Sequence, residues 1–384
     1  MSLIICRVNQ GGTAEIQTFV PIFYIGVKVF FNMIESYGHN KYINEKEKAN
    51  MSLIIPKGYK SSLEVIETQQ AIKDLKDFFE RRLGETLNLT RVSSPLFVLP
   101  ETGANDNLNG IETAVSFEVP DLKKRAEIVH SLAKWKRMAL KKYGFAVNTG
   151  LYTDMNAIRK DEELDNIHSI YVDQWDWELI IDKKDRNMET LKSVVEKIYK
   201  VFKETEEHVN ALYPKIERML PDEITFMTSQ ELLDMYPGLT PKERENKIVK
   251  EKGAVFLMQI GKELSTGDKH DGRSPDYDDW DLNGDILFFN PVLDSAIELS
   301  SMGIRVDEES LERQLKVSGC EDRKELDYHK ALLNGELPYT IGGGIGQSRI
   351  CMYFLQKAHI GEVQSSIWSK EMIKECEENG IHLL

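Results

Sequence analysis

Apolar residues recur along the chain at two different spacings, and each spacing predicts a type of secondary structure. Within residues 65–83 the apolar positions lie three or four residues apart, which is typical of an amphipathic helix. The same spacing predicts one long helix over 188–220, ending before Pro221. Further helices are expected near 128–140 and over 229–236, 241–252, 308–317, 322–333 and 348–356.

Strand-like segments are placed between these helices. Extended or alternating apolar stretches occupy 92–98, 113–119, 167–181 and 254–260. Residues 285–289 and 292–299 are predicted to pair as an antiparallel hairpin with Asn290 and Pro291 at its corner. Because strands lie next to one another and the helices are separate, we expect an α+β fold: a largely antiparallel β-sheet flanked by helices.

The first fifty residues differ from the rest. Met1 to Ile5 recur as residues 51–55, and residues 39–50 are polar and typical of a linker. An apolar stretch over 16–34 is barely long enough to span a bilayer, and Lys28 at its centre makes insertion costly. We therefore predict that 1–50 is an extension of doubtful origin, that 51–384 is a single domain, and that no membrane segment is present.

Composition narrows the class of protein further. The net charge of −14 argues against extensive nucleic-acid binding, which usually needs a basic surface, so any anion site must gather its own arginines and lysines. The four cysteines are far apart and the histidines are scattered, so neither a disulfide framework nor a zinc site is predicted. A reducing, cytoplasmic environment fits this cysteine pattern best.

A glycine cluster that ends in an arginine is the first candidate binding element. Residues 342–349 read Gly-Gly-Gly-Ile-Gly-Gln-Ser-Arg, which we interpret as a loop whose backbone can lie flat against a ligand before Arg349 presents a planar cation. The spacing matches neither the dinucleotide fingerprint nor the phosphate loop, and such a run is often only a tight turn. Its significance depends on the other segments.

Gln174-Trp175-Asp176-Trp177-Glu178 is the second candidate. On a strand, the three polar side chains share one face and the two tryptophans share the other. Taken alone, a half-buried strand with its polar face in water is the simpler interpretation. The functional alternative is a hydrogen-bonding floor under a polar substrate, with the tryptophans as its rigid backing.

Two cationic segments could bind anions. Lys134, Lys136 and Arg137 lie within four residues of an expected helix, either as a solvated face or with one lysine turned inward to neutralise a carboxylate. Arg159 precedes a charged loop, where it could hold a phosphate through two parallel hydrogen bonds or form a surface salt bridge.

Carboxylates on the predicted hairpin suggest a magnesium site. Asp285 and Glu298 fall on paired strands near arginines, and Mg²⁺ prefers oxygen ligands together with phosphate. The acidic run upstream lacks the twelve-residue ligand pattern of a calcium-binding hand. We expect a mobile loop around these residues, which are Asp276, Asp278, Asp279 and Asp281.

Taken in order, these segments resemble one family. Residues 131–136, 159–162, 174–178 and 342–349 resemble the catalytic core of class II aspartyl- and asparaginyl-tRNA synthetases. The closer resemblance, over essentially all of 51–384, is to aspartate–ammonia ligase, the ammonia-dependent asparagine synthetase of the A type. The stretches that carry it are 106–108, 130–137, 171–178, 274–280, 298–306 and 341–349.

This resemblance implies an activity and a set of site residues. The enzyme would use ATP and Mg²⁺ to convert L-aspartate and free ammonia into L-asparagine through a β-aspartyl-adenylate, releasing AMP and pyrophosphate. It would work as a homodimer that pairs through residues 65–98. Aspartate would be bound by Asp106, Lys136, Gln174, Asp176, Ser301 and Arg305, the nucleotide by Arg159, Ser169, Val172 and Arg349, and Mg²⁺ by Asp285 and Glu298. The catalytic candidates are Arg159, Asp176 and Asp279, and the sequence does not decide whether Asp176 or Asp279 deprotonates ammonium.

Two other functions stay open at this point. A tRNA-charging enzyme would need an anticodon-binding module of about a hundred residues, and residues 1–50 are too short for one. A regulatory protein that kept the fold but lost the chemistry is the second alternative, because fold does not fix function. The two arginines Arg159 and Arg349, which such a protein would often have lost, are both present.

Overall fold

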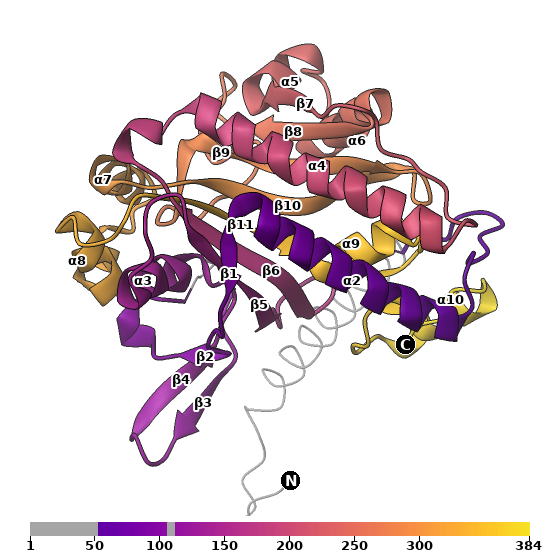
Figure 1. The fold of residues 1–384 in the computed structure, drawn as a ribbon, viewed down its shortest axis with the longest axis horizontal. Coiled ribbons are helices and arrows are strands. Elements are labelled where there is room, and N and C mark those ends of the chain that lie inside the picture. Colours follow the sequence, from indigo (N-terminus) through magenta and orange to yellow (C-terminus); the bar gives the residue numbers. More distant parts are fainter. Residues whose placement is uncertain (1–52, 106–111) are drawn as a thin grey trace, which may run out of the picture. The chain divides into compact units, whose positions relative to one another are not determined.

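A large sheet organises the part of the chain that the structure describes, which is residues 53–105 and 112–384 of a computed structural model (Figure 1). Its strand order is β1-β5-β6-β11-β10-β9-β8-β7. Neighbouring strands are antiparallel except at the edges, where β1 pairs with β5 and β7 pairs with β8 in parallel. The strands are β1 (Leu89–Arg91), β5 (Gly150–Ile158), β6 (Tyr171–Ile180), β7 (Thr225–Thr228), β8 (Ala254–Met258), β9 (Asp278–Asn290), β10 (Ser295–Arg305) and β11 (Thr340–Gly346).

Helices pack on both faces of this sheet, which confirms the predicted α+β fold. They are α2 (Val65–Leu87), α3 (Ala133–Tyr143), α4 (Met188–Leu212), α5 (Ser229–Met235), α6 (Pro241–Lys252), α7 (Glu308–Val317), α8 (Asp327–Leu333), α9 (Gln347–Phe354) and α10 (Lys370–Glu378). A small second sheet extends away from the first (Figure 1) and consists of β2 (Phe97–Val98), β4 (Lys124–Ile128) and β3 (Ser116–Val119). None of the helices in the described ranges has the length and apolar character needed to cross a membrane.

One face of the main sheet is apolar. Helices α2 and α4 run side by side across it (Figure 1), and their buried residues form the largest hydrophobic cluster together with inward side chains of the strands. Trp175 and Trp177 of β6 belong to this cluster, and the Trp175 ring stacks on Phe79 of α2 with 5.0 Å between centroids. The predicted alternation of β6, with its tryptophans on the core side, is therefore confirmed.

The other face is divided between apolar ends and a polar centre. Helices α5 and α6 cover β8 and β9 through Leu232 and Ile248, whereas α3 covers β5 and β6 through Leu140. Between these two apolar clusters, the centre of the face carries polar side chains of β6 and β10, among them Asp176, Glu178 and Arg305. This division leaves a polar strip, bordered by helices, along the middle of the sheet.

The glycine cluster is a strand and not the loop that we expected. Residues 342–344 pair with β6 on one side and with β10 on the other, at the centre of the sheet. A Cβ atom on Gly342 would collide with the carboxylate of Glu178 and lie 2.7 Å from Nη2 of Arg305. These glycines are needed because long polar side chains of the flanking strands cross over β11.

Three other predictions from the sequence are wrong. The acidic run is not a mobile loop, because Asp278 begins β9 and both Asp276 and Asp278 are buried. The long helix ends at Leu212 and not at 220, since the residue before Pro214 disfavours helical geometry. The helix expected over 322–333 is divided at Leu326, which is extended. The helices predicted over 241–252 and 308–317 have the observed bounds, and the remaining predicted helices and the hairpin are present with shifted ends.

We predict that Gly342→Ala lowers the free energy of unfolding by about 1–3 kcal/mol, the usual cost of overpacking. The added methyl group must displace Glu178 and Arg305, whose positions are fixed by their ion pair. Urea denaturation would measure this loss. Gly238→Ala is the matched control, because no atom lies within 4 Å of its added Cβ. Equal unfolding midpoints for the two variants would contradict the proposed requirement for glycine.

Candidate active site

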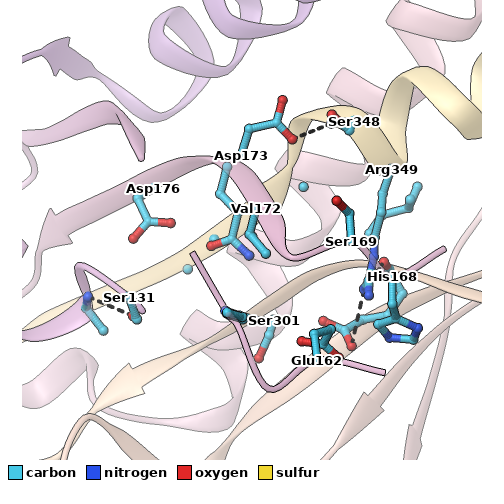
Figure 2. A pocket seen from close by; sticks show the side chains of 18 of the residues that line it. Ser131, Glu162, His168, Ser169, Val172, Asp173, Asp176, Ser301, Ser348 and Arg349 are labelled. Atoms are coloured by element: carbon cyan, nitrogen blue, oxygen red, sulfur yellow. Dashed lines mark hydrogen bonds and ion pairs between the residues drawn. The ribbon is translucent and has the colours of Figure 1, made fainter. Parts of the chain in front are cut away.

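A polar cavity of about 350 Å³ lies on the polar strip of the sheet, within the size range of small-molecule sites. In Figure 2, Asp176 and Ser131 lie toward one side of the view, whereas Arg349, His168 and Ser169 lie toward the other. Most of the residues that the sequence singled out line this cavity: Lys136, Arg159, Ser169, Val172, Gln174, Asp176, Glu298, Ser301, Arg305 and Arg349. Asp106 lies outside the described residues.

Lys136 reaches the floor of the cavity from α3. Only 1% of this residue is exposed, and its Nζ donates a hydrogen bond to the carbonyl of Gly343 at 2.9 Å. The same Nζ lies 3.2 Å from Asp176 Oδ2 and 3.8 Å from Glu178 Oε2. Burial lowers the pKa of Lys136, while the Asp176 carboxylate opposes that shift. For this lysine the inward-turned interpretation is correct and the solvated helix face is wrong.

Arg305 at the end of β10 is held between two carboxylates. Its Nε donates to Glu178 Oε1 at 2.9 Å, its Nη2 donates to Glu178 Oε2 at 2.8 Å, and its Nη1 forms a short ion pair with Asp278. All three side chains are buried. Burial raises the pKa of Asp278, although Arg305 opposes the rise. The geometry of Arg305 is thus fixed before any substrate binds.

Asp176 is the carboxylate on this floor that retains an unsatisfied oxygen. Its Oδ2 faces Lys136, whereas its Oδ1 is buried and accepts no hydrogen bond within the described structure. A Cβ on Gly344 would lie 2.9 Å from this Oδ1 and 2.6 Å from Gln174 Oε1, so both polar groups lie directly over the glycine strand. A buried acceptor without a donor is unstable, which makes it a site for a cationic group of a ligand.

Two arginines distant in the chain face the same cavity. Arg159 follows β5; its Nη2 donates to the carbonyl of His130 at 3.3 Å, and its buried Nε has no acceptor. Among the residues that are described, no carboxylate lies within ion-pair distance of Arg159, so its surface salt-bridge interpretation is wrong. Arg349 is anchored through Nε to the carbonyl of Ile167 at 3.3 Å and through Nη1 to that of Glu298 at 3.0 Å.

Ser169 and Val172 lie beside these arginines. Ser169 is buried, and its hydroxyl donates to Ser366 and accepts from the amide of Tyr171. Because its side chain is already hydrogen-bonded, Ser169 can contact a ligand mainly through its backbone, as the resemblance implied. His168 also lines this end of the cavity, with its Nδ1 2.9 Å from the Asp165 carboxylate.

Asp285 and Glu298 lie on the adjacent strands β9 and β10. Glu298 lines the cavity, but Asp285 does not. The carboxylate of Asp285 forms a short ion pair with Arg273. Burial raises the pKa of Asp285 to about 7; Arg273 opposes the rise and Glu298 adds to it. Two carboxylates on neighbouring strands fit a divalent cation that brings phosphate and water ligands of its own. A cation could reach Asp285 only if Arg273 turned away from it.

Asp279 lies outside the cavity lining. Its Oδ2 accepts from Arg186 at 3.1 Å and its Oδ1 accepts from Arg313 at 3.3 Å. The cavity receives Asp278 instead, because adjacent residues of a strand point to opposite faces. Of the two candidates for ammonium deprotonation, the structure brings Asp176 to the cavity and not Asp279.

An irregularity in β9 explains why sequence reasoning missed the lining residue Asp278. Asn283 pairs with Gly303, but Asp278 pairs with Arg305, so β9 contains extra residues between these two contacts. Strict alternation back from Asp285 therefore selects the wrong aspartate, and no local signal marks the irregularity. Other lining residues that were missed include Asp173, Arg273 and Gln364, which are far apart in the sequence and meet only in the folded chain.

The fold defines the class of protein to which this cavity belongs. The asparaginyl-tRNA synthetase of Entamoeba histolytica, solved in complex with asparaginyl-adenylate, matches with a TM-score of 0.58 and 13% identity, covering 78% of this chain and 66% of that one. The corresponding enzyme of Pyrococcus horikoshii matches with a TM-score of 0.57 and 18% identity, covering 78% and 68%. At these identities the likeness shows the fold alone, which is the catalytic fold of class II aminoacyl-tRNA synthetases.

Sequence similarity then identifies the family. A model of the aspartate-ammonia ligase family matches residues 66–380. The aspartate–ammonia ligase of Clostridium tetani is 68% identical over 338 residues, which is 88% of this chain and 99% of that protein. That of Fusobacterium nucleatum is 64% identical over 326 residues, 85% of this chain and 99% of that protein. The chain therefore belongs to the aspartate–ammonia ligase family, an enzyme family that forms asparagine from aspartate, and the tRNA-charging and regulatory alternatives are set aside.

A buried histidine next to a cavity-lining residue should make the free energy of unfolding depend on pH. His359 precedes the lining residue Ile360; its Nδ1 accepts the amide of Gly361 at 3.0 Å, and burial lowers its pKa from 6.5 to about 4. Because the folded state disfavours the protonated ring, this contribution to stability is complete above pH 6.5 and is lost as the pH falls toward 4.

From pH 7.5 to pH 5, the wild-type protein should therefore lose about 2 kcal/mol more than His359→Asn, at about 1.4 kcal/mol per unit of pKa shift. Asparagine can accept the same hydrogen bond but does not titrate. Urea denaturation at the two pH values tests this. Equal losses of unfolding free energy in the two proteins would show that His359 does not cause the pH dependence of stability.

Proposed function

We propose that this ligase consumes ATP and proceeds through a β-aspartyl-adenylate. In the first step an oxygen of the aspartate β-carboxylate attacks the α-phosphorus of ATP, and pyrophosphate leaves. In the second step ammonia attacks the β-carbonyl carbon. AMP leaves and carries the carboxylate oxygen that attacked phosphorus in the first step. The observation that supports this mechanism is that a single cavity contains both a charged floor, suited to an amino acid, and two arginines, suited to phosphates. The class II structures solved with an asparaginyl-adenylate support the same type of intermediate.

The aspartate molecule occupies the floor end of the cavity in this proposal. Lys136 and Arg305 neutralise its carboxylates, although both also balance the carboxylates of the floor. The unsatisfied Oδ1 of Asp176 accepts from its α-ammonium group. A floor with fixed charges costs no reorganisation when the substrate binds, which favours catalysis. The remaining groups proposed for this end are Gln174, Ser301 and Asp106.

The nucleotide occupies the other end. Arg159, with a buried Nε that lacks an acceptor, stabilises the charge that develops on the α-phosphate. Arg349 lies against the adenine or the γ-phosphate, and the backbone of Ser169 and Val172 contacts the nucleotide. Mg²⁺ held by Asp285 and Glu298 would supply positive charge to the phosphates.

Ammonia must be neutral to act as a nucleophile, so bound ammonium has to lose a proton. We propose Asp176 for this step, because Asp176 lines the cavity, whereas Asp279 does not and both of its oxygens are held by arginines.

A homodimer, a cytoplasmic location and the division into residues 1–50 and 51–384 complete the proposal. The region expected to pair two subunits is α2 with β1. On α2 the side chain of Ile66 is 70% exposed and that of Val65 is 44% exposed, and apolar exposure of this kind is typical of an interface.

The proposal predicts that the wild-type enzyme, given aspartate, ATP, Mg²⁺ and ammonium, releases AMP and pyrophosphate in equal amounts with asparagine. Arg159→Ala should lower aspartate-dependent pyrophosphate exchange by about 100-fold or more, the usual loss when a donor to a developing anion is removed. Arg218→Ala, which removes an exposed arginine far from the cavity lining, should leave exchange unchanged. Release of ADP and inorganic phosphate, or wild-type exchange in Arg159→Ala, would refute the proposal.

A further inference from the structure

Asp173 connects three elements at the nucleotide end of the cavity. It lies on β6 and is only 8% exposed. Its Oδ1 accepts the backbone amide of Ser348 at 3.1 Å and Nε2 of Gln364 at 3.2 Å, and its Oδ2 forms an ion pair with Nζ of Lys76 at 3.0 Å. Figure 2 shows the bond between Asp173 and Ser348 next to Arg349.

The contact with Ser348 replaces a missing helix cap. Helix α9 begins at Gln347, and its N-cap residue is Gly346, which has no side chain to accept the free amides of the first turn. Asp173 supplies this acceptor from the neighbouring strand, and its negative charge also suits the positive end of the helix. The N-terminal cap of α9 therefore comes from β6 and not from the residues next to the helix.

Arg349 lies in the turn that Asp173 caps. It is the third residue of α9, directly after Ser348. Within the described part of the chain, its guanidinium is held by backbone carbonyls of Ile167 and Glu298 and by a 3.8 Å ion pair with Glu298. Loss of the cap would loosen this first turn, because an uncapped helix end frays. The guanidinium would then no longer be held against the nucleotide end.

Lys76 extends this connection to α2. Its side chain is 26% exposed, and the partner carboxylate is almost fully buried, so the ion pair is partly shielded from solvent. Burial lowers the pKa of Lys76, yet Asp173 and smaller contributions from its neighbours raise it above the ordinary value. The ammonium thus remains charged and orients the carboxylate toward Ser348.

We propose that Asp173 is a positioning residue for nucleotide binding: it caps α9 from the adjacent strand, oriented by Lys76, and thereby holds Arg349 in place. This rests on the proposed function, in which Arg349 contacts ATP. Asp173 itself acts through the helix turn and does not take part in the chemistry.

The test compares steady-state KM values for ATP and for aspartate in the full-length enzyme. Asp173→Ala should raise the KM for ATP by about fivefold or more, the factor that corresponds to about 1 kcal/mol for a lost helix cap. The KM for aspartate should change by less than about twofold, since the floor keeps its own ion pairs. Asp173→Asn, which retains an acceptor for the Ser348 amide, should recover most of the ATP affinity.

Lys76→Met should give an intermediate rise in the KM for ATP, and Lys73→Met is its matched control. Lys73 is an exposed lysine of the same helix, and its ion pair with Asp77 is also exposed, so its removal should leave both KM values unchanged. If Asp173→Ala does not fold, Asp173→Asn and Lys76→Met against this control carry the test.

A double-mutant cycle separates this inference from the proposed function. Arg349→Met alone should raise the KM for ATP, and adding Asp173→Ala should then change it by less than about twofold. If Arg349→Met leaves the KM for ATP unchanged, the role proposed for Arg349 fails. If Arg349→Met raises it, but Asp173→Ala has its full effect in that background, or raises both KM values equally, the positioning role of Asp173 is refuted.

Discussion

The polar floor of the cavity depends on the absence of side chains along β11. Glu178 and Arg305 belong to strands on either side of this glycine strand, and their ion pair crosses directly over Gly342. Lys136 reaches the same strand from α3 and donates to its backbone. Glycine at 342 and 344 leaves room for this arrangement, because a Cβ atom at either position would collide with the polar side chains that cross the strand. A local sequence feature, three consecutive glycines, thus determines where charged groups can be buried in the middle of a sheet.

Such a floor is unstable unless its charges are balanced and its backing is firm. Removal of one partner from a buried ion pair typically costs about 3–5 kcal/mol, because the remaining charge is left in a medium of low polarity. Here each cation faces two carboxylates, and Trp175 and Trp177 pack the reverse side of β6 into the main core. Because side chains alternate along β6, packing of its tryptophans in the core also fixes the positions of its polar side chains in the site. The excess of negative charge on the floor favours a ligand with an ammonium group.

Local patterns in the sequence predicted the elements and the role of β6 well, because a period of two residues places its polar and apolar side chains without further information. Local patterns failed where contacts between residues distant in the sequence determine the structure. The glycines of β11 look like a loop until the flanking side chains are known, and the irregularity in β9 exchanges Asp279 for Asp278 at the cavity. Asp173 could not be assigned, since its partners on α2 and α9 are about a hundred or more residues away in the chain. The sequence predicted that Asp285 and Glu298 lie on paired strands, but it did not predict the ion pair of Asp285 with Arg273.

The most direct test of this account follows the oxygen atoms of the β-carboxylate. If the floor holds aspartate so that this carboxylate attacks the α-phosphorus, aspartate labelled with ¹⁸O at the β-carboxylate should transfer one labelled oxygen to AMP for each asparagine formed. Mass spectrometry of the products measures this transfer. Label found in inorganic phosphate or pyrophosphate, with unlabelled AMP, would contradict the central claim that the cavity joins aspartate to the nucleotide at its α-phosphate.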